Sequence, residues 1–177
     1  MSISPDRQYL AVARAEFLEI RDLQSGALLS TVQAKTHANS PDAIIKDVTF
    51  VESSDGALVA IAGHNKIVEL FKIADQGTVL IPQRELHGHA SFIQSMSYDR
   101  DSGWLLTASN DHSIFCWSPL SGERNFVLDE HDLEVIGVSF TDRGRFILSA
   151  SFDGSLIIRE RVSDDRWSPG EPKQVPG

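Results

Sequence analysis

One stretch of the sequence decides the fold: Ile93 to Glu123, which reads IQSMSYDRDSGWLLTASNDHSIFCWSPLSGE. It contains a short alternating segment that ends at Tyr98, a polar turn, an apolar run over 104–108, a tight turn and a second apolar run over 114–117. Apolar runs of about 4–6 residues, bounded by turn residues and rich in β-branched and aromatic side chains, are typical of buried strands. A helix would need about ten or more residues with a period of 3.6, and the sequence shows no such run.

Three other segments, which begin at Ile3, Ile45 and Val135, repeat this pattern, although the first of them lacks its beginning. Units of about 40–50 residues with three or four strands are typical of propeller blades and not of leucine-rich or ankyrin repeats. The sequence therefore predicts an all-β chain of about four units with a Pro/Gly-rich tail. We place the units at 1–36, 37–87, 88–129 and 130–162, and the tail at 163–177.

Composition narrows the classes of partner. The chain has 177 residues, 16 of them basic and 25 acidic, and the net charge of −9 argues against nucleic acid, because phosphate neutralisation needs clustered Lys and Arg. The longest apolar run, 57–62, is far shorter than the roughly 20 residues of a membrane span, and the N-terminus has no secretion pattern. A single cysteine, Cys116, excludes an internal disulfide and predicts a reducing, cytoplasmic compartment.

The repeat resembles the WD40 family over residues 2–162. One marker of that family is a Gly-His pair before the first strand, found as Gly88-His89, and another is an Asp in the inner turn. The spacing from His89 to Asp111 is 22 residues, as is the spacing from His131 to Asp153. Other markers are degenerate: Glu130-His131 and Thr36-His37 replace Gly-His, and the final Trp-Asp reads Arg21-Asp22, Phe71-Lys72, Trp117-Ser118 and Arg159-Glu160.

The resemblance implies antiparallel four-stranded sheets, and in each of them a hydrogen-bonded set of His, Ser or Thr, Asp and Trp. One unit carries the full structural tetrad: His89, Thr107, Asp111 and Trp117. The next unit carries a partial tetrad of His131, Ser149 and Asp153, with Arg159 in place of Trp. In the second unit we expect His64 at the position of the Asp, which predicts a less firmly tied inner turn there.

Chemical alternatives to this structural interpretation are weaker. A catalytic triad of His89, Thr107 or Ser109, and Asp111 lacks the exposed nucleophile turn that such chemistry requires. His87 and His89 could form half of a metal site, but no second cluster has ligand spacing. We therefore expect no enzyme, no cofactor and no metal, and an inert, packed thiol at Cys116 rather than a reactive one.

In the WD40 family, partners usually dock on the narrower propeller face, around the central channel. Carried over by position, the candidate protein-binding residues here are Ile44, Phe92, Asn110, Glu134 and Phe152. Phe92 and Phe152 are either interface anchors or rings tucked against neighbouring blades. The predicted function is a non-catalytic scaffold for a protein or peptide partner. The alternatives are an architectural half-propeller and a sensor segment of a larger signalling protein.

About four units also predict an incomplete ring, because propellers have about four to eight blades and WD40 domains usually about seven. Terminal blades would expose apolar faces, so closure needs further blades from the same polypeptide or from another chain, for instance in a homo-oligomer. Three of the seven prolines fall in the tail, so we expect it to be a poor outer strand, extended or disordered. Trp167 could still dock there as an anchor.

Overall fold

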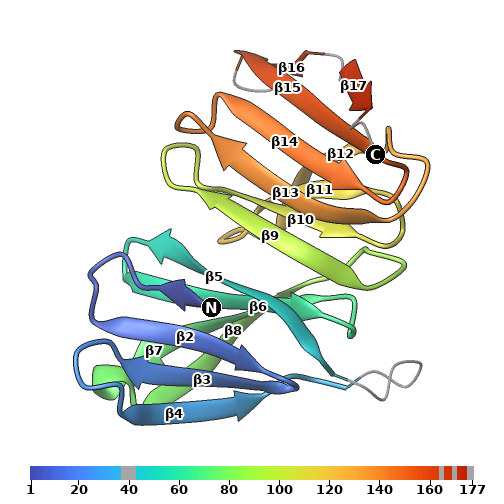
Figure 1. Cartoon of the computed structure of the whole chain (residues 1–177). Helices are drawn as coiled ribbons and strands as arrows, with labels where there is room; N and C mark the ends of the chain where they lie inside the picture. The colour runs from blue at the N-terminus through green and yellow to red at the C-terminus, as the bar shows by residue number, and fades with distance from the viewer. Residues whose placement is uncertain (37–42, 164–165, 169–170, 175–177) are drawn as a thin grey trace. The chain divides into compact units, whose positions relative to one another are not determined.

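The computed structural model describes residues 1–36, 43–163, 166–168 and 171–174, and every long element in them is a β-strand (Figure 1). The chain forms four antiparallel sheets and divides into two compact units, Met1–Ile93 and Gln94–Gly177. The predicted all-β class and the antiparallel sheets are thus confirmed. Among the described residues, no helix has the length and hydropathy that a membrane span requires.

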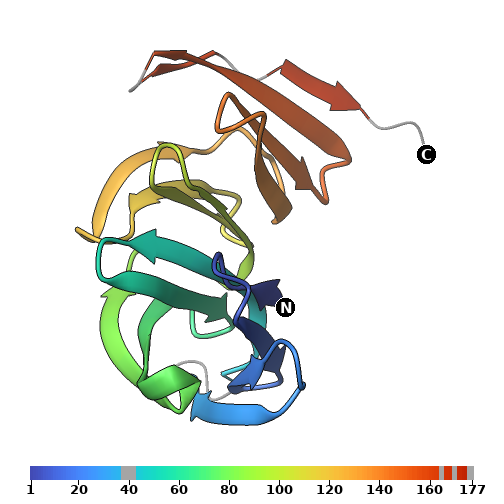
Figure 2. The ribbon, with the colours of Figure 1, turned by 90° about the vertical axis from the view of Figure 1, so that its left-hand side faces the viewer.

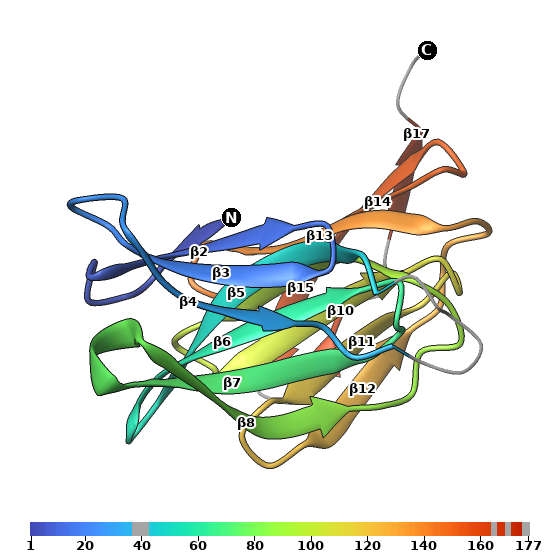
Figure 3. The same ribbon diagram turned by 90° about the horizontal axis from the view of Figure 1, so that it is seen from below.

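The first unit contains two four-stranded sheets, each with its strands in chain order (Figure 3). One sheet consists of β1 (Ser2–Ile3), β2 (Tyr9–Arg14), β3 (Phe17–Asp22) and β4 (Leu28–Gln33). The other consists of β5 (Ile45–Ser53), β6 (Gly56–Gly63), β7 (Val68–Ala74) and β8 (Val79–Leu86), with the short 3-10 turn η1 (Asp75–Gly77) before β8.

Alternation explains the core of this unit, since every second side chain of a strand reaches the same face. Leu18 and Ile20 of β3 are fully buried, and Val59 and Ile61 of β6 belong to the same apolar cluster. Gly63 ends β6 where the chain approaches itself closely: a Cβ there would lie 2.0 Å from the carbonyl oxygen of Ile44. Only glycine fits at this position.

The second unit also contains two sheets. The first consists of β9 (Ile93–Asp99), whose first residue closes the first unit, β10 (Trp104–Ser109), β11 (Ile114–Ser118) and β12 (Glu123–Leu128). The second consists of β13 (Val135–Thr141), β14 (Phe146–Ser151), β15 (Ser155–Ser163) and the short β16 (Arg166–Trp167), with β17 (Glu171–Gln174) also paired to β15. Leu106 and Cys116 of one sheet share a core with Val138 and Ile147 of the other.

The tail differs from the expectation of a poor outer strand. Both β16 and β17, drawn in red, pair antiparallel with β15 (Figure 2). Pro172 of β17 lies opposite Ile157 of β15. An edge strand tolerates proline, because only one side of its backbone forms hydrogen bonds to a neighbouring strand. The ring of Trp167 also holds the tail against the sheet, because its centroid lies 6.0 Å from that of Phe126 and 6.3 Å from that of Phe140. Tail residues 164–165, 169–170 and 175–177 lie outside the described part of the chain.

Candidate functional site

A chain of polar contacts ties the β12–β13 loop to the β14–β15 turn. His131 lies in the loop with its side chain only 2% exposed. Its Nε2 lies 2.8 Å from Ser149 Oγ and its Nδ1 lies 3.0 Å from Asp153 Oδ2. The backbone N–H of Asp132 also donates to Asp153 Oδ2, at 3.0 Å. The three residues of the predicted partial tetrad are therefore brought together, and they hold the loop in place.

The ionisation of Asp153 contributes to this arrangement. Burial alone would raise the pKa of Asp153, but hydrogen bonds from Ser155, from His131 and from the backbone of Asp132 hold it well below its usual range. A carboxyl whose pKa is lower in the folded than in the unfolded state stabilises the fold above its unfolded pKa, and this stabilisation is lost as the pH falls.

We therefore predict an acid-dependent difference between wild type and Asp153→Asn. The variant is expected to be less stable at pH 6, and the gap should close as the pH falls below about 4, where the unfolded carboxyl takes up its proton. Urea unfolding between pH 6 and pH 3 measures this. Asp142→Asn, at a carboxyl whose side chain is 60% exposed, is the matched control. A gap that stays constant with pH would contradict the assignment.

The full tetrad predicted for the sheet of β9–β12 is divided between the units, with His89 in the first unit and the other three residues in the second. In the second unit, the Trp117 indole N–H donates to Thr107 Oγ1 at 3.0 Å, and both residues are buried. Asp111 lies in the β10–β11 turn, where its Oδ1 accepts hydrogen bonds from the backbone N–H and the hydroxyl of Ser113. His89 belongs to the first unit and is 8% exposed. The Thr107 hydroxyl is engaged and inaccessible, so it cannot serve as an exposed nucleophile.

Arg159, at the position of Trp117, is bound in a way that sequence reasoning missed. Its guanidinium is buried, and Nη2 forms an ion pair with Glu130 Oε2 from the loop. Burial lowers the pKa of Arg159 to about 10 while the nearby Asp129 opposes this, so the group is charged at neutral pH. Two departures from the family pattern, Glu130 for Gly and Arg159 for Trp, thus meet in space. Their signal was the appearance of opposite charges at two markers of one repeat.

The second sheet corrects the prediction about His64. Register pairs Ala62 with Val68 as it pairs Ala108 with Ile114, so Asn65 and not His64 takes the position of Asp111. The prediction was one residue out because only the register aligns the two turns. The ring of His64 instead stacks on that of Phe92 at 4.2 Å.

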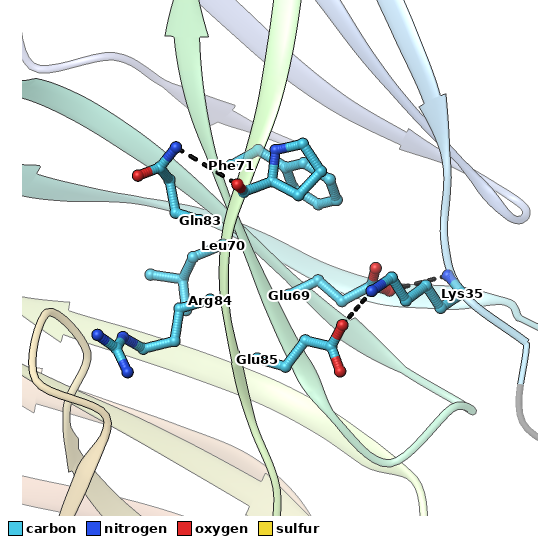
Figure 4. A pocket seen from close by; sticks show the side chains of 8 residues that line it. Lys35, Glu69, Leu70, Phe71, Gln83, Arg84 and Glu85 are labelled. Atoms are coloured by element: carbon cyan, nitrogen blue, oxygen red, sulfur yellow. Dashed lines mark hydrogen bonds and ion pairs between the residues drawn. The ribbon is translucent and has the colours of Figure 1, made fainter.

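Asn65 and Glu69 form the tie that His and Asp form elsewhere. Glu69 is 2% exposed, and its Oε1 accepts hydrogen bonds from Asn65 Nδ2 at 2.8 Å and from the backbone N–H of Lys35 at 3.0 Å. Figure 4 shows the second of these bonds, between Glu69 and Lys35. Asn65 also donates to the carbonyl of Lys35. The inner turn is therefore firmly tied, contrary to our expectation. The degenerate Gly-His site ends in His37, which lies outside the described residues.

A cavity of about 260 Å³ opens beside Glu69, lined by β7, β8 and Lys35. Burial raises the pKa of Glu69, although Lys35 and Asn65 oppose this. The Lys35 ammonium forms an ion pair with Glu85 (Figure 4). The other carboxylate oxygen of Glu85 lies 3.0 Å from His87 Nε2. Lys35 thus contacts both carboxylates from within the chain, Glu85 through its ammonium and Glu69 through its backbone N–H, and these contacts account for the polar side of the cavity.

The candidate protein-binding residues also divide between the units. In the first unit Ile44 is 38% exposed, its carbonyl accepts the backbone N–H of His64, and Phe92 is half-buried on the His64 ring. In the second unit, Asn110 accepts a hydrogen bond from Gln94 at 2.8 Å. The other two members, Glu134 and Phe152, are joined by a backbone hydrogen bond of 3.0 Å.

Phe92 and Phe152 thus have different surroundings. The Phe92 ring packs on a neighbour, whereas Phe152 is 66% exposed, the most exposed aromatic side chain among the described residues. Within that part of the chain, no group of three or more His, Cys, Asp and Glu side chains could hold a metal ion.

Cys116 is packed in the core of the second unit. It is fully buried, and burial raises the pKa of its thiol to about 12, although a hydrogen bond from Asn125 and the charge of Arg161 oppose the rise. Since the thiolate is the reactive form, we predict that a maleimide will not label the native protein and will label it completely in denaturing urea. Mass spectrometry of both samples measures this. Rapid labelling of the folded chain would contradict the buried placement.

Repeated antiparallel sheets of four or five strands, with polar contacts that tie loops to turns, define an all-β protein of the propeller class. Comparison with known proteins then identifies two repeats, since residues 80–118 and 122–159 match the family described as WD domain, G-beta repeat. The chain thus contains two WD40 repeats, and WD40-repeat proteins are generally non-catalytic and mediate contacts between proteins.

Several relatives are similar to the chain. It is 27% identical over 157 residues to COMPASS component SWD3 of Saccharomyces cerevisiae, which covers 88% of this chain and 46% of that protein. It is 32% identical over 124 residues to Periodic tryptophan protein 2 of the same yeast, covering 64% of this chain and 13% of that protein. It is 33% identical over 98 residues to Ribosome biogenesis protein YTM1 of Podospora anserina, covering 53% and 19%. The chain thus spans less than half the length of these curated relatives.

Proposed function

We propose that this chain is a non-catalytic interaction module that presents Phe152 and the neighbouring β12–β13 loop to a protein partner. The observation that carries the proposal is the exposure of Phe152, at 66%, on a turn whose backbone is held in place. The Phe152 N–H donates to the carbonyl of Glu134, and Asp153 beside it holds His131. Aromatic side chains on a rigid support are favoured anchors at protein interfaces, because little ordering entropy remains to be lost on binding.

Two relatives support a protein partner by what their names say of them: one is a component of COMPASS and one acts in ribosome biogenesis. This proposal assigns partner binding to fewer residues than the five candidate protein-binding residues predicted from the sequence. Phe152 and Glu134 form its centre, while Phe92, stacked on His64, serves mainly in packing.

The test is a comparison of partners captured by immobilised wild type and by Phe152→Ala. We expect specific proteins, identified by mass spectrometry, to be lost in the variant, and the melting temperature to change by no more than about 2 °C, because the ring contributes little to the core. Leu120→Ala, at a leucine that is 49% exposed in the same unit, is the matched control. Capture that is identical for wild type and Phe152→Ala would overturn the proposal.

A second candidate function, an architectural role, rests on one face of the last sheet. Leu148 and Ala150 of β14 and Leu156 and Ile158 of β15 alternate with buried residues and are themselves only half-buried. An apolar sheet face of this kind is normally covered by another layer. If a second copy covers it, light scattering will give about twice the 19.5 kDa of the chain, and Leu148→Glu will restore the monomer. A wild-type monomer would contradict this role.

A further inference from the structure

The surface around Phe152 combines exposed apolar side chains with carboxylates. Leu133 is 44% exposed, Ile136 is 41% exposed and Phe152 is 66% exposed. Asp132 is exposed and Glu134 is half-buried on the same loop. We name these five residues the acidic–apolar patch. Three large apolar side chains exposed within one short stretch of surface are typical of an interaction site rather than of scattered surface residues.

The backbone beneath the patch is fixed on both sides. Ser151 Oγ donates to the carbonyl of Leu133 at 3.1 Å, and the Phe152 N–H donates to the carbonyl of Glu134 at 3.0 Å. Glu134 and Phe152 are therefore neighbours on adjacent segments. Ile136 occupies a β-bulge, since the register of β13 shifts between Val135 and Gly137. Bulges of this kind redirect a side chain, here that of Ile136, which is exposed although Val135 beside it is fully buried.

The charge of the patch has one sign. No lysine or arginine occurs between 126 and 141 or between 151 and 155, whereas the loop contains Asp129, Glu130, Asp132 and Glu134. Arg159 reaches this loop, but its side chain is 2% exposed and paired with Glu130. The cation is therefore beneath the surface, and the side chains that face solvent are acidic. A partner must offer positive charge beside its apolar contacts to complement them.

From this we infer that the acidic–apolar patch binds a basic peptide segment in which Lys or Arg residues flank an apolar side chain. This inference rests on the proposed interaction function and adds the chemistry of the partner. Nucleic acid does not fit, because its phosphates would meet carboxylates. A second copy of this chain does not fit in a symmetric contact either, because it would place the carboxylates of one patch against those of the other.

The experiment uses fluorescein-labelled twelve-residue peptides and fluorescence polarisation with the full chain. The peptides alternate Arg and Leu, Arg and Gly, or Glu and Leu, and a single-stranded oligonucleotide serves as a fourth probe. We expect the Arg/Leu peptide to bind at least about tenfold more tightly than each of the others, and its affinity to fall as salt is raised. Phe152→Ala should weaken it by about tenfold or more, as should the pair Asp132→Asn with Glu134→Gln.

Two control variants keep the test specific: Leu120→Ala removes an exposed leucine, and Glu123→Gln removes an exposed carboxylate elsewhere in the same unit. Both should leave the affinity for the Arg/Leu peptide unchanged. Equal binding of the Arg/Gly peptide would show attraction by charge alone and overturn the inference, as would equal binding of the oligonucleotide. Tight, Phe152-dependent binding of the Glu/Leu peptide would overturn the basic partner while leaving the proposed function standing. Failure of the proposed function is seen separately, as Phe152-independent capture.

Discussion

Glu130→Ala is expected to lower the free energy of unfolding by about 3 kcal/mol, because it removes the ion-pair partner of the charged, buried Arg159 guanidinium and leaves only the nearby charge of Asp129. Removing one member of a buried ion pair costs about 3–5 kcal/mol, and the low end applies because the side chain of Glu130 is 41% exposed. The pKa of Arg159, lowered by burial to about 10, is still far above neutral pH, so the group cannot escape the penalty by losing its proton. Urea unfolding at pH 7 measures the loss.

The control for Glu130→Ala is a substitution at Glu160, the residue that follows Arg159 in β15. Glu160 pairs with Arg145 at 2.8 Å, but both side chains are about half exposed to solvent. Exposed ion pairs contribute about 0–1 kcal/mol, so Glu160→Ala should have little effect. The double variant Glu130→Gln with Arg159→Met should recover most of the loss, because it removes both charges at once. Equal effects of Glu130→Ala and Glu160→Ala would show that Arg159 does not depend on Glu130.

The fold was predictable because short apolar runs between turn residues indicate the strands within each repeat. Runs such as 104–108 and 114–117 became strands β10 and β11 almost to the residue, since apolar runs between turns have few other ways to bury themselves. The tail was harder to predict. Proline content indicated a poor strand there, while the pairing of β16 and β17 and the docking of Trp167 depend on an edge that only the folded sheet provides.

The candidate site, like the fold, was only partly predictable from the sequence. The resemblance to the WD40 family, together with the 22-residue spacing from His131 to Asp153, predicted the set of His131, Ser149 and Asp153. The Glu130–Arg159 pair joins positions 29 residues apart that each read as a loss of the pattern. Position in the repeat did not show that Phe92 is packed and Phe152 exposed. The exposure of each ring depends on whether a neighbour, such as His64 for Phe92, supplies a surface on which it packs.

His131→Ala is expected to cost about 3 kcal/mol of unfolding free energy and to loosen the loop that presents the acidic–apolar patch. Its imidazole contacts Ser149 Oγ at 2.8 Å, Asp153 Oδ2 at 3.0 Å and Ser155 Oγ at 3.1 Å. Ser149 is 2% exposed, so water cannot replace the lost partner without opening the structure. An unsatisfied buried polar group costs about 1–3 kcal/mol, and both Ser149 and Asp153 are affected.

His87→Ala is the matched control for His131→Ala. His87 lies in the first unit with its side chain 57% exposed, and its contact with Glu85 is on the surface. That variant should change the unfolding free energy by less than about 1 kcal/mol. Hydrogen exchange of the amides of Asp132 and Phe152, which donate to Asp153 and to Glu134, separates a loosened loop from a general loss of stability, because their protection should fall more than that of the β14 core. If His131→Ala costs no more than His87→Ala, the imidazole does not hold the loop, and the rigid support of the patch must come from the backbone bonds of Asp132, Leu133 and Glu134.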